Sequence, residues 1–298
     1  MRKLGIALTT LLLLGVLVLM LFGSGLLPFS ATEKEKRTVW RPEGFFTSSR
    51  QEDADYTFAA VPILKIKNPL GDIRVQGTDG QEILVSLTKK TTAPLNRQAE
   101  ELLHKITLEI TEDEQGKELT VNIPPTGDGE KAEAHLFVKV PYATKVDLHG
   151  GLGSIFVSAT QGQLRVINES GPIELSQHSG NAALETYLGN IRIGGADLTD
   201  ELVAITKLGD LFVAGRLAAK NVLESELGNL TLLLPPDDAY ILEGEFSQGD
   251  FSTTIPFKGE HSGGRVKGII GEGKHRGSII VNLKLGSLRL TDGKGGDK

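Results

Sequence analysis

The sequence predicts an all-β protein: a β-solenoid or repetitive β-roll with a capping β region that contains one short helix, preceded by an N-terminal transmembrane helix. Three observations predict it. Glycines recur every nine residues in the C-terminal half, where 25 of the 36 glycines lie. A short phrase of glycine, turn residue and apolar-polar-apolar strand returns about every twenty residues, as in stacked repeat folds. An uncharged run of 19 residues stands near the N-terminus.

Residues 1–30 are predicted to form a signal anchor. The run Leu4–Phe22 has no charge, and a helix of this length, at about 1.5 Å per residue, crosses a hydrocarbon core of roughly 30 Å. Arg2 and Lys3 precede the run, so the positive-inside rule predicts a single-pass protein of the cytoplasmic membrane with its bulk extracytoplasmic. Cleavage after the small residues at 23–25 would instead give a secreted protein.

Residues 31–57 are polar and of mixed charge, and are predicted to be a juxtamembrane linker. Residues 58–291 are predicted to be the β-strand-repeat domain. Its opening part, 58–143, holds one early copy of the phrase, Gly71-Asp72-Ile73-Arg74-Val75. Asn96 as N-cap with an apolar face predicts a short helix, between strands expected at 82–90, 106–112, 118–123 and 134–140. Solenoids need atypical ends that stop edge-to-edge growth, so we interpret this part as a cap.

The main repeat array is predicted at 145–256. Its phrases begin at six glycines with spacings of 18, 18, 20, 19 and 21 residues: Gly153, Gly171, Gly189, Gly209, Gly228 and Gly249. A further copy of the phrase follows at Gly286. Glycine tolerates φ > 0, and the Asp, Asn or Ser beside it forms the local hydrogen bonds of a tight turn. The next residues alternate apolar and polar, so stacking copies at about 4.8 Å, with two short strands per unit, would build a continuous core.

Stacking predicts two rows of side chains. The first apolar residue of each copy would lie in one internal row, Ile155, Ile173, Ile191 and Leu211. The outward column would read Phe156, Glu174, Arg192, Phe212, Thr231 and Ser252. Glu174 opposite Arg192 would be a favourable cross-strand pair, and Phe156 and Phe212 are candidate contacts for a partner.

The end of the chain offers little chemistry. Residues 259–277 are rich in glycine and basic residues, but they match no phosphate-loop or dinucleotide pattern. We interpret them as a long turn between the final strands. The tail at 292–298 is expected to be disordered.

Composition excludes several classes of function. The chain has no Cys, which excludes disulfides, thiol nucleophiles and Cys-based metal sites. The net charge is −6, which argues against a nucleic-acid partner, because that affinity depends on neutralising phosphates.

No catalytic, cofactor-binding or metal-binding residue is predicted, and no cofactor. No serine lies in a nucleophile elbow. The six histidines have no zinc-binding spacing: His104, His135, His149, His178, His261 and His275. Asp72, Asp210 and Asp250 share one position of the phrase and could form a calcium or polysaccharide-cleaving column. Ser, Pro and Asn fill that position elsewhere, which is typical of a turn.

These motifs, in order, resemble a bacterial family of putative adhesins of the β-strand-repeat type, a domain of unknown function in cell-envelope proteins. The resemblance rests on Asn68-Pro69-Leu70-Gly71-Asp72-Ile73-Arg74-Val75, the strand end Val140-Pro141, the repeated phrase, and the ending from Ile269-Ile270-Gly271 to Leu290. It covers 58–291 and implies a solenoid-like all-β fold with a non-catalytic envelope role.

The leading hypothesis is a non-enzymatic, membrane-anchored extracytoplasmic protein that acts as an envelope scaffold or adhesin-like interaction module. Its partner would be a cell-envelope protein or cell-wall polymer. One alternative is a polysaccharide-active β-helix enzyme, which needs acidic or basic groups that converge in one cleft. Another is an envelope-stress sensor or regulatory partner, whose cytoplasmic part would be only Met1-Arg2-Lys3.

Overall fold

A computed structural model describes residues 47–292 of the chain. These residues form 22 strands and one short helix, which confirms the all-β class with a single short helix. The predicted anchor at 1–30, most of the predicted linker and nearly all of the predicted tail lie outside the described residues. Within residues 47–292 no helix has the length and apolar character needed to span a membrane.

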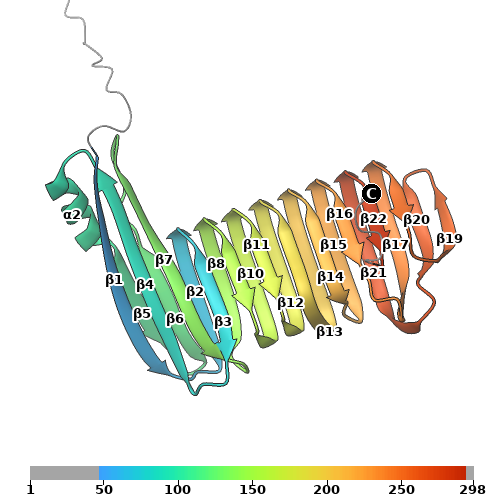
Figure 1. Cartoon of the computed structure of the whole chain (residues 1–298), viewed down its shortest axis with the longest axis horizontal. Coiled ribbons are helices and arrows are strands. Elements are labelled where there is room, and N and C mark those ends of the chain that lie inside the picture. The colour runs from blue at the N-terminus through green and yellow to red at the C-terminus, as the bar shows by residue number, and fades with distance from the viewer. Residues whose placement is uncertain (1–46, 293–298) are drawn as a thin grey trace, which may run out of the picture. The chain divides into compact units, whose positions relative to one another are not determined.

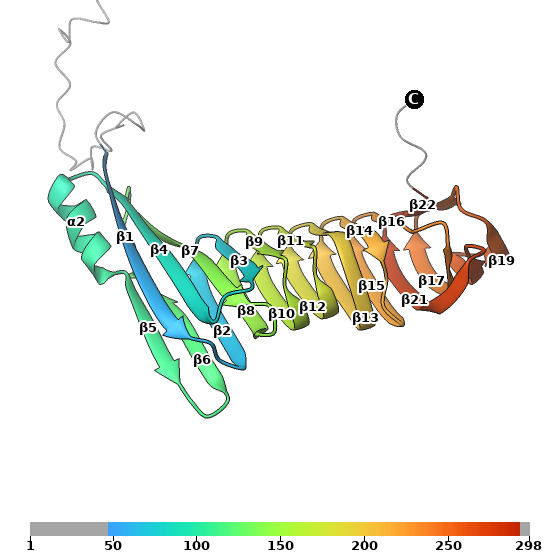
Figure 2. The ribbon, with the colours of Figure 1, turned by 60° about the horizontal axis from the view of Figure 1, so that its bottom comes forward.

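The repeats stack as coils, each with a long strand, a glycine corner and a short strand (Figures 1 and 2). The prediction of two short strands per unit is therefore wrong, because one strand of each coil has eight or more residues. Five coils follow in chain order: β8 (Lys145–Leu152) with β9 (Ile155–Ser158), β10 (Gln161–Ser170) with β11 (Ile173–Ser176), β12 (Ser179–Leu188) with the start of β13 (Ile191–Leu208), the rest of β13 with β14 (Leu211–Arg216), and β15 (Lys220–Leu227) with β16 (Leu230–Leu233).

The internal row is confirmed. Ile155 pairs with Ile173, Ile173 with Ile191, and Ile191 with Leu211, all in parallel register. Each of these four side chains is at most 1% exposed. One apolar column therefore runs through the stack, as the alternation within the phrase requires.

The order of coils in space departs from the order of the phrases in the sequence. The early copy, formed by β2 (Ile63–Leu70) and β3 (Ile73–Thr78), pairs directly with β8 and β9. At the other end, β21 (Lys274–Leu285) and β22 (Leu288–Thr291) lie between the coil of β15 and β16 and the coil of β17 (Asp238–Gln248) and β18 (Phe251–Thr253). The last phrase of the sequence is thus not the last coil of the stack.

The glycine corners explain the repeat. A Cβ on Gly171 would lie 2.0 Å from the Gly153 carbonyl oxygen, and one on Gly189 would lie 2.1 Å from that of Gly171. No side chain fits at such distances, and Gly171 also has a φ of 130°. Gly162 and Gly180 have positive φ at the start of the long strands. The nine-residue spacing therefore counts two different bends of one 18-residue coil.

Buried polar side chains sit under these corners and satisfy their carbonyl groups. Asn168 Nδ2 donates to the Gly153 and Gly171 oxygens at 2.9 and 3.0 Å. Thr206 Oγ1 donates to the Gly189 oxygen at 2.9 Å, and Ser225 Oγ donates to that of Gly209 at 3.1 Å. Since an unpaired buried carbonyl is costly, this polar row lets the tight corners remain inside the stack.

The N-terminal cap is a set of antiparallel strands with a helix. β4 (Glu82–Ala93) pairs with both β7 (Lys131–Pro141) and β1 (Ser48–Ala59), while β5 (Thr107–Glu112) and β6 (Gly116–Asn122) pair with each other. The linker prediction is wrong for residues 48–57, which belong to β1; their mixed charges occupy an alternating strand, which a polar composition does not reveal. The helix α2 (Asn96–Lys105) has Leu95, not Asn96, at its N-cap.

The C-terminal end is also antiparallel. β20 (Arg265–Ile270) pairs with β17 and with β19 (Phe257–Ser262). The long turn expected at 259–277 is therefore wrong: the segment forms most of a hairpin. Gly263 and Gly264, with φ of 57° and 77°, make its two-residue turn, the conformation that favours Gly-Gly between paired strands.

Candidate interaction surface

The outward side chains of the long strands form rows along the stack. Parallel pairing places Ile205, Glu224, Asn282 and Glu245 in register across β13, β15, β21 and β17. Two residues nearer the strand ends, a second row holds Lys207, Glu226, Lys284 and Ser247. Because side chains alternate along a strand, both rows face solvent on one side of the sheet.

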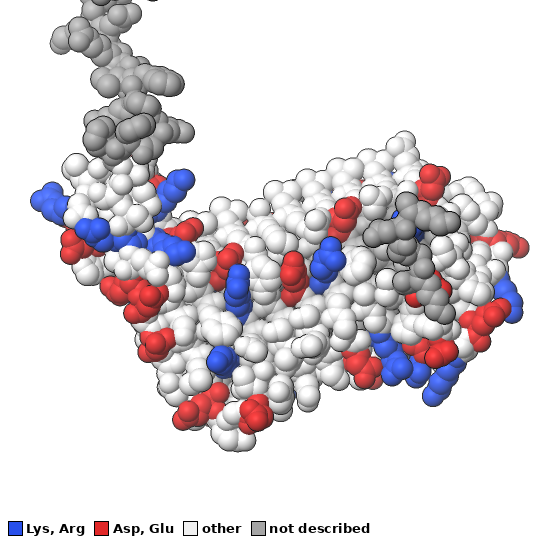
Figure 3. Space-filling model, in the orientation of Figure 1, with Lys and Arg blue, Asp and Glu red and all other residues white. Residues whose placement is uncertain are grey.

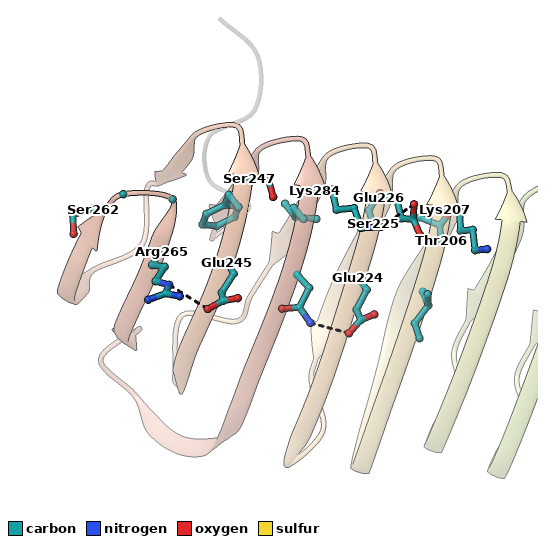
Figure 4. Close-up of a pocket in the computed structure, with 16 residues that line it drawn as sticks. Thr206, Lys207, Glu224, Ser225, Glu226, Glu245, Ser247, Ser262, Arg265 and Lys284 are labelled. Atoms are coloured by element: carbon teal, nitrogen blue, oxygen red, sulfur yellow. Dashed lines mark hydrogen bonds and ion pairs between the residues drawn. The ribbon is translucent and has the colours of Figure 1, made fainter.

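A hollow of about 840 Å³ lies over these rows (Figure 4). The turn of the β19–β20 hairpin, Ser262 to Arg265, forms one wall of it. Phe246 lies between the outward Glu245 and Ser247 and is only 7% exposed, so it offers the lining little apolar surface. The hollow therefore combines a sheet face with a hairpin wall, and we call it the C-terminal hollow.

Every carboxylate of the hollow has a partner. Glu245 Oε1 lies 3.2 Å from Arg265 Nε, and Glu226 Oε2 lies 3.1 Å from Lys284 Nζ. Asn282 Nδ2 donates to Glu224 Oε1 at 2.8 Å. With Lys207, three cationic and three acidic side chains line the hollow, so their formal charges cancel.

An exposed aromatic ring stands at the next coil. Tyr187 is 53% exposed, and Lys207 Nζ lies 4.5 Å from the centre of its ring. Because Lys207 also lines the C-terminal hollow, the Tyr187 side chain lies beside this hollow. A flat ring next to alternating donors and acceptors can bind a ligand with both apolar faces and hydroxyl groups.

The predicted outward column is confirmed from Phe156 to Thr231, with Glu174 opposite Arg192. Two arginines were missed. Arg74 lies beside Phe156, and Arg289 stands between Thr231 and Ser252, because their coils stack there. The Arg74 guanidinium lies 4.8 Å from the Phe156 ring centre, and that of Arg192 lies 4.7 Å from the Phe212 ring centre. Cation–π contacts within the stack therefore occupy both phenylalanines that we considered as partner contacts.

The shared Asp position is a turn, but its hydrogen bonds join neighbouring coils rather than closing locally. Asp72 Oδ1 accepts from Ser154 N at 2.9 Å, and Asp210 Oδ1 accepts from Asn229 N at 2.7 Å. Asn190 Oδ1 accepts from Asp210 N at 2.8 Å in the same way. Pro172 has no N–H, so the ladder is interrupted there. This pattern explains why Asp, Asn and Ser alternate at the position.

The histidines are spread along the stack. His135 lies near Asp72 and Glu133, and His149 near Asp147. His178 is buried: its Nδ1 lies 3.0 Å from Thr160 Oγ1 and its Nε2 lies 3.2 Å from Asn181 O. Burial lowers the pKa of His178. Across residues 47–292, no group of three His, Asp or Glu is arranged to hold a metal ion.

Of the residues that line the C-terminal hollow, only the wall from Ser262 to Arg265 falls in a segment with a prediction, the long turn expected at 259–277. A signal for the sheet face of the hollow exists, because the position two residues before the corner glycine holds a polar or aromatic residue in each of six successive phrases: Glu169, Tyr187, Lys207, Glu226, Ser247 and Lys284. The hairpin wall, Ser262 to Arg265, lies outside the repeat and has no such signal.

Comparison with known proteins identifies solved structures alone. No protein-family model matches the sequence, and no curated protein matches it significantly. A putative adhesin from Bacteroides fragilis is 13% identical, with a TM-score of 0.42 over 83% of this chain and 100% of that one. A putative adhesin from Parabacteroides distasonis is 10% identical, with a TM-score of 0.44 over 80% and 97%. A putative lipid binding protein from Parabacteroides distasonis is 13% identical, with a TM-score of 0.34 over 80% and 96%.

The resemblance to putative adhesins that the repeated motif indicates is thus also found among solved structures, from Bacteroides fragilis and Parabacteroides distasonis.

Proposed function

We propose that this chain is a membrane-anchored, extracytoplasmic interaction module without enzymatic activity, which binds a cell-wall polysaccharide in an adhesin-like role. The C-terminal hollow is its binding site. The uncharged run Leu4–Phe22 behind Arg2 and Lys3 supports the anchor and the orientation.

The pairing of charges in the hollow carries the proposal. Because the formal charges of the lining side chains cancel, the hollow has no net charge that would attract an anionic or a cationic ligand over long range. Acceptors and donors alternate instead, from Glu224 through Asn282 to Glu245 and Arg265, on strands about 4.8 Å apart. Hydroxyl groups of a sugar chain can donate to the carboxylates and accept from the amide and guanidinium groups. Tyr187 adds an aromatic surface beside them, because it is 53% exposed even with Lys207 against its ring, whereas Phe156 and Phe212 are only partly exposed.

Hydrolysis requires a different arrangement. A glycosidase needs one protonated carboxylic acid and one free carboxylate on either side of the scissile bond. In the hollow, Glu226 and Glu245 already form ion pairs with Lys284 and Arg265, and Glu224 accepts a hydrogen bond from Asn282. Each of the three acids is therefore placed as a hydrogen-bond acceptor beside a donor side chain, which favours binding over the polysaccharide-active alternative.

The test is sedimentation of the full chain, in mild detergent, with insoluble cell-wall polysaccharide. We expect the chain to co-sediment, and the double variant Tyr187→Ala/Arg265→Ala to bind at least tenfold more weakly. Thr231→Ala, on the short-strand face, is the matched control and should bind like the original chain.

Equal binding by the double variant would contradict the site. Retention of the chain by envelope proteins but not by polysaccharide would favour a protein partner. Release of reducing ends, abolished by Glu226→Gln, would establish the enzyme alternative.

A further inference from the structure

A row of exposed leucines marks one corner of the stack. In six of the eight phrases, a leucine directly precedes the corner glycine, and the pairing register puts these residues in one column, the leucine corner: Leu70, Leu152, Leu188, Leu208, Leu227 and Leu285. Ser170 lies within the column and Gln248 ends it. Five of the leucines are 39–54% exposed, whereas the inward leucines of the coils are at most 3% exposed.

The leucine corner forms a band that is mostly uncharged. Figure 3 shows few charged side chains along the edge of the stack where the long strands end. On the long-strand side, the flanking row holds Glu169, Lys207, Glu226 and Lys284, two of each sign. On the other side lie the turn residues, whose Asp72 and Asp210 carboxylates accept backbone N–H groups. Contact with this corner would therefore depend on apolar burial rather than on charge.

The chain enters the described structure at the same edge. Ser48 of β1 pairs with Ala93 of β4, and Thr92 of β4 pairs with Lys131 at the start of β7. β7 runs parallel to β3, which begins just after the first corner, at Ile73. The start of β1 therefore lies on the leucine-corner edge (Figure 1). Leu95, the most exposed large apolar residue described at 61%, follows β4 on this edge.

We propose that the leucine corner lies against the lipid bilayer that holds the N-terminal anchor. This rests on the anchor of the proposed function. The residues between Phe22 and Ser48 span at most about 3.5 Å each, so the stack stays near the membrane and meets it at a high effective concentration. The edge that carries the leucine corner is the one from which this tether leaves.

Lipid suits the corner better than a protein does. The strip is one leucine wide between polar rows, whereas a stable protein interface buries roughly 800 Å² on each partner. Acyl chains have no fixed shape to match, so shallow insertion of single apolar side chains is sufficient. A second copy of the chain would instead have to place the charged flanking rows against its own.

The absence of Cys allows a direct test. The full chain carries one introduced cysteine with a bimane label, at Leu208→Cys or, as matched control, at Thr231→Cys on the short-strand face. Both variants are reconstituted into phosphatidylcholine vesicles with and without nitroxide-labelled lipid. We expect the labelled lipid to quench bimane fluorescence at least twofold at position 208 and little at position 231. Because 1 M salt shortens the screening length to about 3 Å, quenching that depends on apolar contact should be unchanged in it. Circular dichroism confirms that both variants fold.

Each other outcome overturns the proposal. Equal quenching at the two positions shows that the corner does not face lipid. In a separate sample, pyrene replaces bimane on the cysteine at position 208. Excimer fluorescence that disappears when the chain is diluted in lipid would show that the leucine corner contacts a second copy of the chain. If the chain does not float with the vesicles, both the anchor and the corner contact fail; if it floats without quenching at position 208, only the corner contact fails.

Discussion

The middle of the stack and its C-terminal end are built on the same coil but are held in place differently. From β8 to β16, chain order and stacking order agree, the same corner and internal row recur in each coil, and the polar row recurs in each coil from β10 onward. At the C-terminal end, β21 inserts between β15 and β17. Contacts that do not recur along the described stack hold it there. Repetition therefore determines the shape of a coil, whereas individual contacts determine its place.

Asp238 is the main individual contact. Its side chain is 1% exposed and lies 2.5 Å from Arg276 Nε of β21 and 3.5 Å from Arg216 Nε of β14. Close by, the Leu217 amide donates to Tyr240 Oη at 3.2 Å. This cluster joins coils that are distant in sequence, and no other coil repeats it.

The largest expected effect is therefore at Asp238. Asp238→Ala leaves two arginines facing a buried site without their carboxylate, which costs about 4 kcal/mol in the free energy of unfolding. Hydrogen exchange should increase over β17, β20 and β21 and stay low over β8 to β12.

Glu243→Ala is the control, since its pair with Lys267 at 2.7 Å is solvent-exposed and should matter much less. Uniform loss of protection along the whole stack would show that the two regions do not differ in this way.

A glycine corner tests the middle region. Gly171→Ala places a Cβ 2.0 Å from the Gly153 oxygen at a φ of 130°, so the coils must separate locally. We expect a loss of about 3 kcal/mol, from left-handed strain and overpacking together. Gly162→Ala is the matched control: its φ is 91°, but nothing lies within 4 Å of the added Cβ, so it should lose about 1 kcal/mol from strain alone. Urea unfolding of both variants measures the difference, and equal losses would exclude the close approach as the cause.

The difference between the two regions also decides which parts of the fold could be predicted. The internal row depends only on alternation after each glycine, and Ile155, Ile173 and Ile191 lie where that pattern places them. The insertion of β21 could not be derived, because Gly249 follows Gly228 by 21 residues, close to the spacing of adjacent coils. Every phrase has the same pattern, so none specifies its neighbour; Asp238 and its arginines do, through contacts between residues far apart in sequence.

The C-terminal hollow shows the same division. The row of Lys207, Glu226 and Lys284 recurs in the sequence and could have been found. The wall at Arg265 comes from a hairpin outside the repeat. Its strand β19 is almost wholly exposed and gives no apolar alternation to detect, and β20 buries only Val266 and Ile270.

Alkaline pH should weaken the C-terminal end. Burial and the nearby Asp238 carboxylate raise the pKa of Tyr240 to about 12, from about 10 in the unfolded chain. The unfolded state therefore loses its proton first, so stability falls as pH rises from 10 to 12, by about 2 kcal/mol. Tyr240→Phe should remove that slope in urea unfolding between pH 9 and 11.5, and a slope that persists in the variant would assign it to other groups.

The smallest effect, from acid, should fall on the middle of the stack. His178 is neutral in the fold: Nε2–H donates to Asn181 O, and Nδ1 accepts from Thr160 Oγ1. Burial lowers its pKa below the usual 6.5, so the unfolded chain binds a proton that the folded chain does not. The stability that His178 contributes is complete above pH 6.5 and declines as pH falls through its lowered pKa. His178→Gln keeps a donor and an acceptor but cannot titrate, so its unfolding free energy between pH 7.5 and 5 should lack this decline. Hydrogen exchange at pH 5 should locate the added opening at β10 to β12 rather than at β17 to β21; the reverse location would mean that the end of the stack, and not its middle, responds to acid.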